Sequence, residues 1–255
     1  MYTIATLHHL RSHLGLAAAD TSEDVRLMDA LRAAAAQIER AAGRHFLPRR
    51  TTIVHREGIR STELLLGDDL LELIAVEDAN GTIPLEDVVT LPANGPASVL
   101  TLKNGRFFTP GENGVSVTGI WGWHDEWARA WHSSADTVAD DPLSSTSVVV
   151  SVEDADGLDG TFQAPRFQVG QLLAIGAEYL RVMRVDTALN HLYTQRGVAG
   201  TQNAVHPHFS PILVYQPPSD VRDLAVRWAA YLYKQGSPVP QSFYEPLLSL
   251  RRERV

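Results

Sequence analysis

Apolar residues recur at helical spacing in three parts of the chain. Near the start, they are three, three and four residues apart, at Ile4, Leu7, Leu10 and Leu14. Similar stripes run between Val25 and Ala42 and between Val221 and Leu232. The pattern predicts helices over residues 3–15, 22–43 and 219–235. Because the last helix is too short to be stable alone, we expect its apolar stripe to pack against the first two.

The ends of these helices carry capping signals. Thr21 and Asp24 match the [ST]xx[DE] pattern, in which a hydroxyl and a carboxylate accept hydrogen bonds from unpaired backbone N–H groups. Gly43 suits a left-handed stop at the end of the second helix. Ser219 follows two prolines and is the expected cap of the third helix.

Between the helices, the pattern changes to short strand-like runs separated by turn residues. Asn80-Gly81 and Asn104-Gly105 indicate hairpins, because both residue types tolerate the positive φ angles of tight turns. The runs predict strands at Thr51–His55, Glu63–Leu66, Leu73–Asp78, Val99–Leu102 and Val115–Trp121. We therefore expect a small antiparallel sheet within residues 49–124, packed against the helices.

A second block of strands follows residues 125–146, which lack periodicity and are predicted to form a loop. Gly176-Ala177 fits a two-residue turn within this block. The predicted strands are Ser147–Val152, Leu172–Ile175, Tyr179–Val185, Leu192–Arg196 and Ile212–Tyr215. Short strands with Gly-rich connections favour a compact β-barrel.

The predicted fold class is α+β: a helical bundle with a small antiparallel sheet, interrupted by an inserted small β-barrel domain. The discontinuous core would comprise residues 1–142 plus 218–255, and the barrel residues 143–217. An exposed loop with neighbouring ends tolerates such an insertion at little cost.

Composition narrows the class of protein. The chain has 255 residues, of which 44% are hydrophobic and 20% charged, as is typical of a folded protein. It has no cysteine, which excludes disulfides and thiolate metal sites. No run approaches the ~20 apolar residues of a membrane span, and the first residues lack a signal-peptide layout. We therefore expect no membrane association and a cytosolic protein.

The net charge of −8 is unevenly distributed. Residues 51–142 contain five Lys and Arg against fifteen Asp and Glu, a net charge of −10, whereas both ends of the chain are weakly basic. Binding to nucleic acid requires clustered Lys and Arg, so a phosphate-gripping surface is hard to build on this block.

The sequence contains no GxxxxGK[ST], GxGxxG, GxSxG or HExxH motif. The best metal candidate is His206 and His208 with His191, but alternate histidines on an extended chain are common by chance, so no metal site is predicted. His8, His9 and His13 are interpreted as exposed surface histidines. We accordingly predict no catalytic residues and no cofactor.

Four of the five tryptophans lie close together in the sequence, at Trp121, Trp123, Trp127 and Trp131. Such density is compatible with a sugar-stacking face. We favour a structural aromatic cluster in the core or at a subunit interface.

Four segments resemble the head-tail connector proteins of long-tailed bacteriophages, also called head-completion or head-to-tail adaptor proteins. They are residues 36–46 (AQIERAAGRHF), Asn80-Gly81, residues 104–107 (NGRF) and residues 117–124 (VTGIWGWH). In that family, a helix with an IE-x-x-x-GR-x-F ending leads into a small sheet, and a later helix returns to the first ones. The inserted segment looks like a strand-rich module of several phage neck and tail proteins, which small adaptors lack.

The resemblance implies a structural virion protein and not an enzyme. Such proteins form a ring, usually of twelve copies, that docks beneath the portal protein and extends the DNA channel toward a downstream neck, stopper or tail protein. Double-stranded DNA would pass through without specific binding. The protein would reside at the virion neck, and in the host cytoplasm during assembly.

Two sets of site residues follow from this hypothesis. An acidic wall would not grip passing DNA, so the channel lumen or subunit interface is assigned to Asp68, Asp69, Glu72, Glu86 and Asp87. An aromatic anchor followed by cations suits a groove with an acidic rim, so portal docking is assigned to Phe243, Tyr244, Leu247, Leu248, Arg251, Arg252 and Arg254. The alternative function is a carbohydrate-binding or cell-wall glycan hydrolase component of a phage tail, since small barrels often bind sugars.

Overall fold

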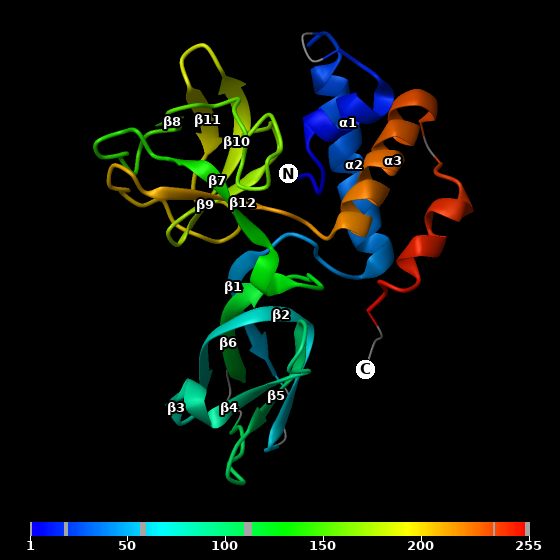
Figure 1. Ribbon diagram of the computed structural model, residues 1–255. Helices are drawn as coiled ribbons and strands as arrows, with labels where there is room; N and C mark the ends of the chain where they lie inside the picture. The colour runs from blue at the N-terminus through cyan, green and yellow to red at the C-terminus, as the bar shows by residue number, and fades with distance from the viewer. Residues whose placement is uncertain (1, 18–19, 57–59, 110–113, 237, 253–255) are drawn as a thin grey trace. The chain divides into compact units, whose positions relative to one another are not determined.

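The computed structural model describes residues 2–17, 20–56, 60–109, 114–236 and 238–252. The fold is mostly β, with two antiparallel six-stranded sheets (Figure 1). The chain divides into two compact units. The smaller unit is Arg44–Trp127, and the larger unit joins Met1–Gly43 to Ala128–Val255.

The smaller unit contains the first sheet, in the order β1-β6-β2-β5-β4 with β3 paired to β2. Its elements are β1 (Arg49–His55), β2 (Glu63–Asp78), β3 (Gly81–Ile83), η1 (Leu85–Asp87), β4 (Val88–Leu91), β5 (Ala97–Leu102), β6 (Val115–Trp121) and the 3-10 turn η2 (Trp127–Arg129), which ends beyond the unit. Val76, Phe108, Val117 and Trp121 are almost fully buried in its core. The indole N–H of Trp121 donates to Thr51 O at 2.9 Å, so the largest core side chain has its polar atom paired.

The larger unit contains the second sheet, in the order β7-β12-β9-β10-β11-β8. Its strands are β7 (Trp131–Thr137), β8 (Val149–Ser151), β9 (Leu172–Ile175), β10 (Glu178–Asp186), β11 (His191–Gln195) and β12 (Pro211–Tyr215). Gly176-Ala177 forms the predicted two-residue turn, because Ile175 pairs with Glu178 and Gly176 has φ 57°.

The helices also belong to the larger unit. They are α1 (Leu7–Leu14), α2 (Asp24–Ala42) and α3 (Ser219–Gln235), followed by the 3-10 turns η3 (Gln241–Phe243) and η4 (Glu245–Leu247). The prediction that α3 packs against α1 and α2 is confirmed. Trp228 of α3 is fully buried, and its indole N–H donates to Gln37 Oε1 at 2.9 Å.

The predicted fold class is wrong. Within the described residues, the two sheets dominate, the helices do not build a helical bundle, and neither sheet closes into a barrel. Closure of the second sheet would need a ladder between β7 and β8, its outer strands. Just beyond β7, the Ala139 N–H instead donates to Ser151 O at 2.9 Å, without strand pairing. Periodicity reveals strands, but strand order and closure depend on pairing between residues far apart in sequence.

Two local predictions also fail. The segment 125–146 contains β7, which is held by pairing with β12 and not by its own polar sequence. Glu63–Leu66 and Leu73–Asp78 belong to the one long strand β2, although Gly67-Asp68-Asp69 looks like a turn. The strand continues because it exchanges its partner β5 for β6 through bulges near Leu70. The division into a core and an insertion at 143–217 stays a prediction about independent folding.

The predicted N-caps of α2 and α3 are wrong, whereas the predicted C-terminal stop of α2 is confirmed. The N-cap of α2 is Glu23 and that of α3 is Pro218, and neither makes a side-chain cap hydrogen bond. The Asp24 carboxylate is taken by an ion pair with Arg11, which explains why it does not complete a capping box. Gly43 ends α2 with φ 65°, as predicted.

At α1, the capping box uses a histidine. Thr6 Oγ1 accepts a hydrogen bond from the His9 N–H at 3.2 Å, and the Thr6 N–H donates to His9 Nδ1 at 3.4 Å. His9 is therefore a half-buried cap residue and not the exposed histidine that was predicted. Burial, and then the nearby positive charge of Arg222, lower the pKa of His9 from 6.5 to about 4.

We predict that stability falls as the pH drops from 6.5 to 4, because the unfolded chain then binds a proton that His9 in the folded chain refuses. The loss attributable to His9 should be about 3 kcal/mol by pH 4. Urea unfolding at several pH values should show this dependence weakened in His9→Gln and unchanged in the control His13→Gln, which alters an exposed residue. NMR titration of His9 near its ordinary pKa would contradict the prediction.

A buried carboxylate organises one end of the second sheet. Glu178 accepts hydrogen bonds from Arg196 Nε and Nη2 at 2.6 and 2.7 Å, and His206 Nε2 lies 2.8 Å from its Oε2. The backbone N–H groups of Gly197 and Ala204 also donate to it. Burial alone would raise the pKa of Glu178, but hydrogen bonds from Arg196, Ala204 and His206 outweigh it and lower the pKa to about 2.

We predict that Glu178→Gln lowers the free energy of unfolding by about 3–5 kcal/mol, because it leaves the Arg196 charge buried without its partner. Hydrogen exchange at the Gly197 and Ala204 amides should accelerate. The control Glu153→Gln changes an exposed carboxylate of the same unit and should have little effect. Equal losses in the free energy of unfolding for the two substitutions would contradict a stabilising role of the Glu178 network.

Candidate functional site

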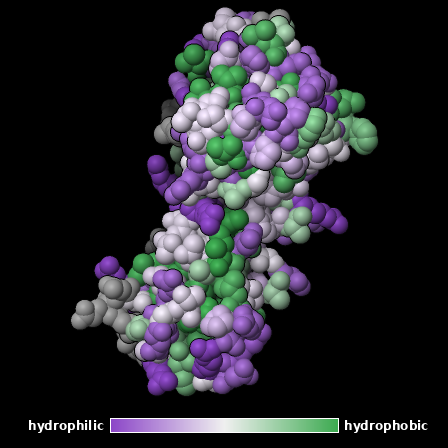
Figure 2. Space-filling view, turned by 90° about the vertical axis from the view of Figure 1, so that its left-hand side faces the viewer, coloured by the Kyte–Doolittle hydropathy of each residue, from purple (hydrophilic) through white to green (hydrophobic). Residues whose placement is uncertain are grey.

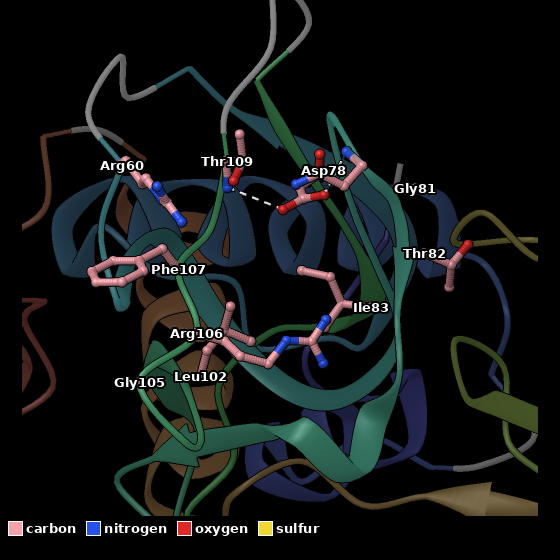
Figure 3. A pocket seen from close by; sticks show the side chains of 11 residues that line it. Arg60, Asp78, Gly81, Thr82, Ile83, Leu102, Gly105, Arg106, Phe107 and Thr109 are labelled. Carbon is pink, nitrogen blue, oxygen red and sulfur yellow. Dashed lines mark hydrogen bonds between the residues drawn. The ribbon is translucent and has the colours of Figure 1, made fainter.

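A pocket in the smaller unit brings together both Asn-Gly turns (Figure 3). Its volume is about 400 Å³. Ile83 and Leu102 are buried and give it an apolar floor. Arg60, Arg106 and Phe107 provide charged and aromatic groups around that floor (Figure 3).

The two turns position these groups. At the first, Asp78 of β2 pairs with Gly81 of β3, which confirms the predicted hairpin and places its loop at Ala79 and Asn80. At the second, Asn104 and Gly105 have φ 56° and 68°. Both residues are left-handed, so the chain reverses sharply after β5 and carries Arg106 and Phe107 to the pocket. The predicted hairpin at this turn is wrong, because β5 pairs with β2 and β4 and not with β6, the strand that follows the turn.

The Asp78 carboxylate connects the two sides. Its Oδ1 accepts a hydrogen bond from the Asn80 N–H at 2.8 Å, and its Oδ2 accepts one from the Thr109 N–H at 3.0 Å. The Ala79 N–H in turn donates to Thr109 O at 3.0 Å. The loop of the first turn is therefore tied to the segment that follows the second.

Two guanidinium groups give the pocket its chemistry. Arg60 lies over the Phe107 ring, 4.7 Å from its centroid, and Arg106 forms an ion pair with Asp87. Figure 3 shows Arg60 and Arg106 approaching the pocket from different segments. Guanidinium groups bind carboxylates in a planar, two-point fashion, and the ring adds an apolar contact. The arrangement suits a carboxylate-bearing segment with an apolar neighbour.

The acids predicted for the lumen do not form one bare negative surface. Asp68 pairs with Arg49, Asp69 lies 3.7 Å from Arg44, and Asp87 pairs with Arg106. Of the set, Glu72 and Glu86 are exposed. The smaller unit contains seven Lys and Arg against twelve Asp and Glu, a net charge of −5 and not −10, because it begins upstream of residue 51 and ends before residue 142. A lumen or interface role for these acids stays a prediction.

The four tryptophans are divided between the units. Trp121, Trp123 and Trp127 lie in the smaller unit, where Trp123 packs edge-on against Phe46 with ring centroids 5.8 Å apart. Trp131 belongs to the larger unit. Its ring lies 5.1 Å from that of Tyr179 and 5.2 Å from that of Tyr215. The four tryptophans therefore do not form one cluster. They belong to two aromatic groups, one in each unit, and the boundary between the units falls between Trp127 and Trp131.

The C-terminal segment assigned to portal docking lies on the helices of its own unit. The Trp228 ring packs against Phe243 and Tyr244, with centroids 5.7 and 4.9 Å apart. Leu247 is buried, whereas Leu248 is 64% exposed. Portal docking through the buried members would require their release from α3, so Leu248 is the apolar residue best placed for contact.

The three arginines of this segment differ in their contacts and in whether the structure describes them. Arg251 is exposed, and its Nε donates to Ala41 O at 3.3 Å. The Arg252 N–H donates to Ala42 O at 3.1 Å, which fixes the chain at the end of α2. Arg254 lies outside the described residues. The portal-docking role stays a prediction for all of them.

The histidines considered as metal ligands have other contacts. His206 lies against Glu178, and His208 Nδ1 is 3.1 Å from Ala139 O. His191 is part of β11 and pairs with Ser151. In the described part of the chain, no group of three potential ligand side chains gathers.

Sequence reasoning missed this pocket, although both of its turns were recognised. The signal available was the pair of Asn-Gly dipeptides, but their convergence depends on the pairing of β2 with β5. On the face that Figure 2 shows, polar side chains cover much of the surface, and apolar ones form a narrow band in the lower half of the view.

Comparisons with known proteins gave no identification. A scan against protein-family models found no matching family, and a search of curated proteins found no match. Among the described helices, none is both long and apolar enough to cross a membrane. A proposal about function therefore depends on the sequence resemblance described above and on the contacts within the chain.

We predict a graded loss of stability when Asp78 is changed. Asp78→Asn keeps one acceptor oxygen and should cost about 1 kcal/mol, whereas Asp78→Ala removes both acceptors and should cost about 2 kcal/mol. Hydrogen exchange at Asn80 and Thr109 should accelerate in the same order. Glu77→Ala alters the exposed neighbour and is the control. An ungraded response would mean that the carboxylate does not tie the two turns together.

Proposed function

We propose that this protein is a head-to-tail adaptor of a long-tailed bacteriophage. Copies of the chain, most simply twelve, form a ring beneath the portal that extends the DNA channel and offers a docking surface to the neck or tail. The proposal rests on the resemblance of four sequence segments together with the contacts that these segments make.

The observation that carries the proposal is that the resembling segments meet in pairs. Residues 36–46 end at Phe46, which packs against Trp123 of residues 117–124. Arg44 lies 5.4 Å from the Trp123 ring centroid, and the Trp123 N–H donates to His45 O at 2.6 Å. The other two segments line one pocket. Unrelated chance matches would have no reason to contact one another, whereas residues specifying one structural corner would.

Ring formation needs two different complementary surfaces, because each copy meets the next head to tail. The pocket with Arg60 and Arg106 is one candidate surface, and the exposed Glu72 and Glu86 are candidate acids for the other. Opposite charges at such a contact favour one register of neighbouring copies. The net charge of −5 on the smaller unit also suits a wall that DNA slides past.

The test is assembly with the portal protein. Purified chain mixed with portal rings should give stacked rings by negative-stain microscopy. Arg60→Glu should prevent ring formation while the chain stays folded, since Arg60 is exposed and the substitution repels the acidic partner. Arg50→Glu reverses another exposed charge of the same unit and serves as the control.

The docking surface can be tested separately. Leu248→Asp should leave rings intact but weaken their stacking on the portal, because Leu248 is exposed in the C-terminal segment. No association of the wild-type chain with portal at micromolar concentrations would contradict the proposal. Binding to a glycan array without ring formation would instead favour the carbohydrate-binding alternative.

A further inference from the structure

The pocket of Figure 3 has the features of a docking site for an aromatic ring that lies beside an acid. Ile83 and Leu102 are buried and form its floor, whereas Arg60 and Phe107 are exposed and lie against each other. A volume of about 400 Å³ is large enough for an aromatic side chain. The exposed guanidinium group of Arg60 attracts carboxylates, so the occupant should combine an exposed ring with negative charge.

A segment of the larger unit has this combination. Residues 153–163, here called the acidic loop, contain four Asp and Glu and no Lys or Arg. Glu153, Asp154 and Asp156 are exposed. Phe162, near the end of the acidic loop, is 83% exposed, which is the largest exposed fraction of any large hydrophobic residue in the described part of the chain.

Hydrogen bonds hold the tip of the acidic loop in one conformation. The Asp159 N–H donates to Gln163 O, and the Phe162 N–H donates to Asp159 O, both at 2.9 Å. The Gln163 N–H donates to Asp159 Oδ1 at 3.0 Å. The Gly160 N–H donates to Ser133 O at 2.9 Å, which attaches the tip to β7. The exposed ring of Phe162 is therefore presented from a fixed backbone, which lowers the entropy lost when the ring binds.

The backbone conformation of Phe162 is unfavourable for a phenylalanine. Its φ is 63°, in the left-handed region that bulky residues rarely adopt. Phe162 is the last of three residues that connect Asp159 to Gln163, and glycine is the usual residue at that position of such a loop. A strained and exposed ring does not stabilise the free chain. Contact with a second molecule would offset the strain, because it would bury the ring.

Phe209 provides a comparison within the same unit. It is 67% exposed, and its φ is 62°, so it resembles Phe162 in both respects. Residues 204–210, however, contain no Asp or Glu. Charge complementarity with Arg60 therefore favours Phe162 over Phe209 as the occupant of the pocket.

We propose that the acidic loop of one copy of the chain inserts Phe162 into the pocket of the next copy, with its acids beside Arg60. The loop belongs to the larger unit and the pocket to the smaller unit, so every copy carries both halves of the contact. Such a heterologous contact repeats from copy to copy, as a ring requires. Glu72 and Glu86 lie in stretches of the sequence without an aromatic residue, so they match the apolar floor less well. The inference rests on the proposed adaptor function for the expectation that copies associate head to tail.

Two single-site variants separate the halves of the contact. Phe162→Gly removes the ring but keeps the pocket, and Arg60→Glu changes the pocket but keeps the acidic loop. Each variant alone should self-associate about ten- to hundredfold more weakly than wild type, which corresponds to loss of one buried aromatic ring or charge contact. An equimolar mixture should form a dimer and stop there, because one intact contact remains in each pair. Analytical ultracentrifugation of the full chains measures this, and a mixture that stays monomeric at millimolar concentrations would overturn the proposal.

Thermal unfolding of dilute, monomeric chain distinguishes a binding role of the Phe162 ring from a structural one. Phe162→Gly should raise the melting temperature by about 2–4 °C, because glycine adopts a left-handed φ without strain. Phe209→Gly is the matched control, since it relieves the same strain in the same unit. It should raise the melting temperature similarly and leave association unchanged. A lower melting temperature for Phe162→Gly, or equal losses of association in the two variants, would overturn the proposal.

Assembly on the portal protein separates this inference from the adaptor function. If the wild-type chain does not stack on portal rings but the mixture of Phe162→Gly and Arg60→Glu still forms a dimer, the contact is supported without the adaptor function. If Phe162→Gly forms stacked rings as readily as wild type, the adaptor function is supported and the contact is overturned.

Discussion

The second sheet depends on the pairing of Glu178 with Arg196. Each N–H of the Arg196 guanidinium has an acceptor: two are the Glu178 oxygens, and three are the carbonyl oxygens of Ser144, Ser147 and Ala204. A buried ion pair is tolerated only when its remaining donors and acceptors are satisfied in this way. The pair fixes three stretches of irregular chain near the start of β10 and the end of β11. It matters because β11 and β12 are consecutive in sequence but separated by β10 and β9 in the sheet.

A second arginine does the same for the connection between β8 and β9. Arg166 donates from Nη1 to Asp136 at 2.7 Å and to Asp154 O at 2.8 Å, and from Nε to Leu158 O at 3.0 Å. Asp136 also accepts hydrogen bonds from the N–H groups of Glu153 and Asp154. Long connections without ladder hydrogen bonds must satisfy their backbone groups by other means. In this unit, the arginines of two arginine–carboxylate pairs donate to carbonyl oxygens of the connections, and so they hold the connections against the strands.

The comparison of sequence with structure separates local from non-local information. The burial of Val221, Leu224 and Trp228 followed from spacing alone, as did the left-handed stop at Gly43, because each depends on a few neighbouring residues. The continuity of β2 through Asp68 could not be predicted. It depends on Arg49, nineteen residues earlier, pairing with that carboxylate and on the exchange of strand partners. The pocket of Figure 3 could be predicted only in part for the same reason. Each of its two turns depends on neighbouring residues, but the contact between the turns depends on strand pairing.

The charge counted along the sequence also differs from the charge arranged in space, and this difference bears on the proposed function. A block of sequence between residues 51 and 142 carries a net charge of −10, yet the compact unit Arg44–Trp127 carries −5 and internally pairs three of the acids assigned to the channel. The field that a passing phosphate would experience comes from groups in space, and an ion-paired carboxylate repels it far less than a bare one. Glu72 and Glu86 therefore carry more of the proposed repulsion than the count of acidic residues implies. By the same reasoning Arg106, which is paired with Asp87, attracts a neighbour less than Arg60 does, and a local positive charge within a mildly acidic unit specifies the register of a neighbour better than uniform charge does.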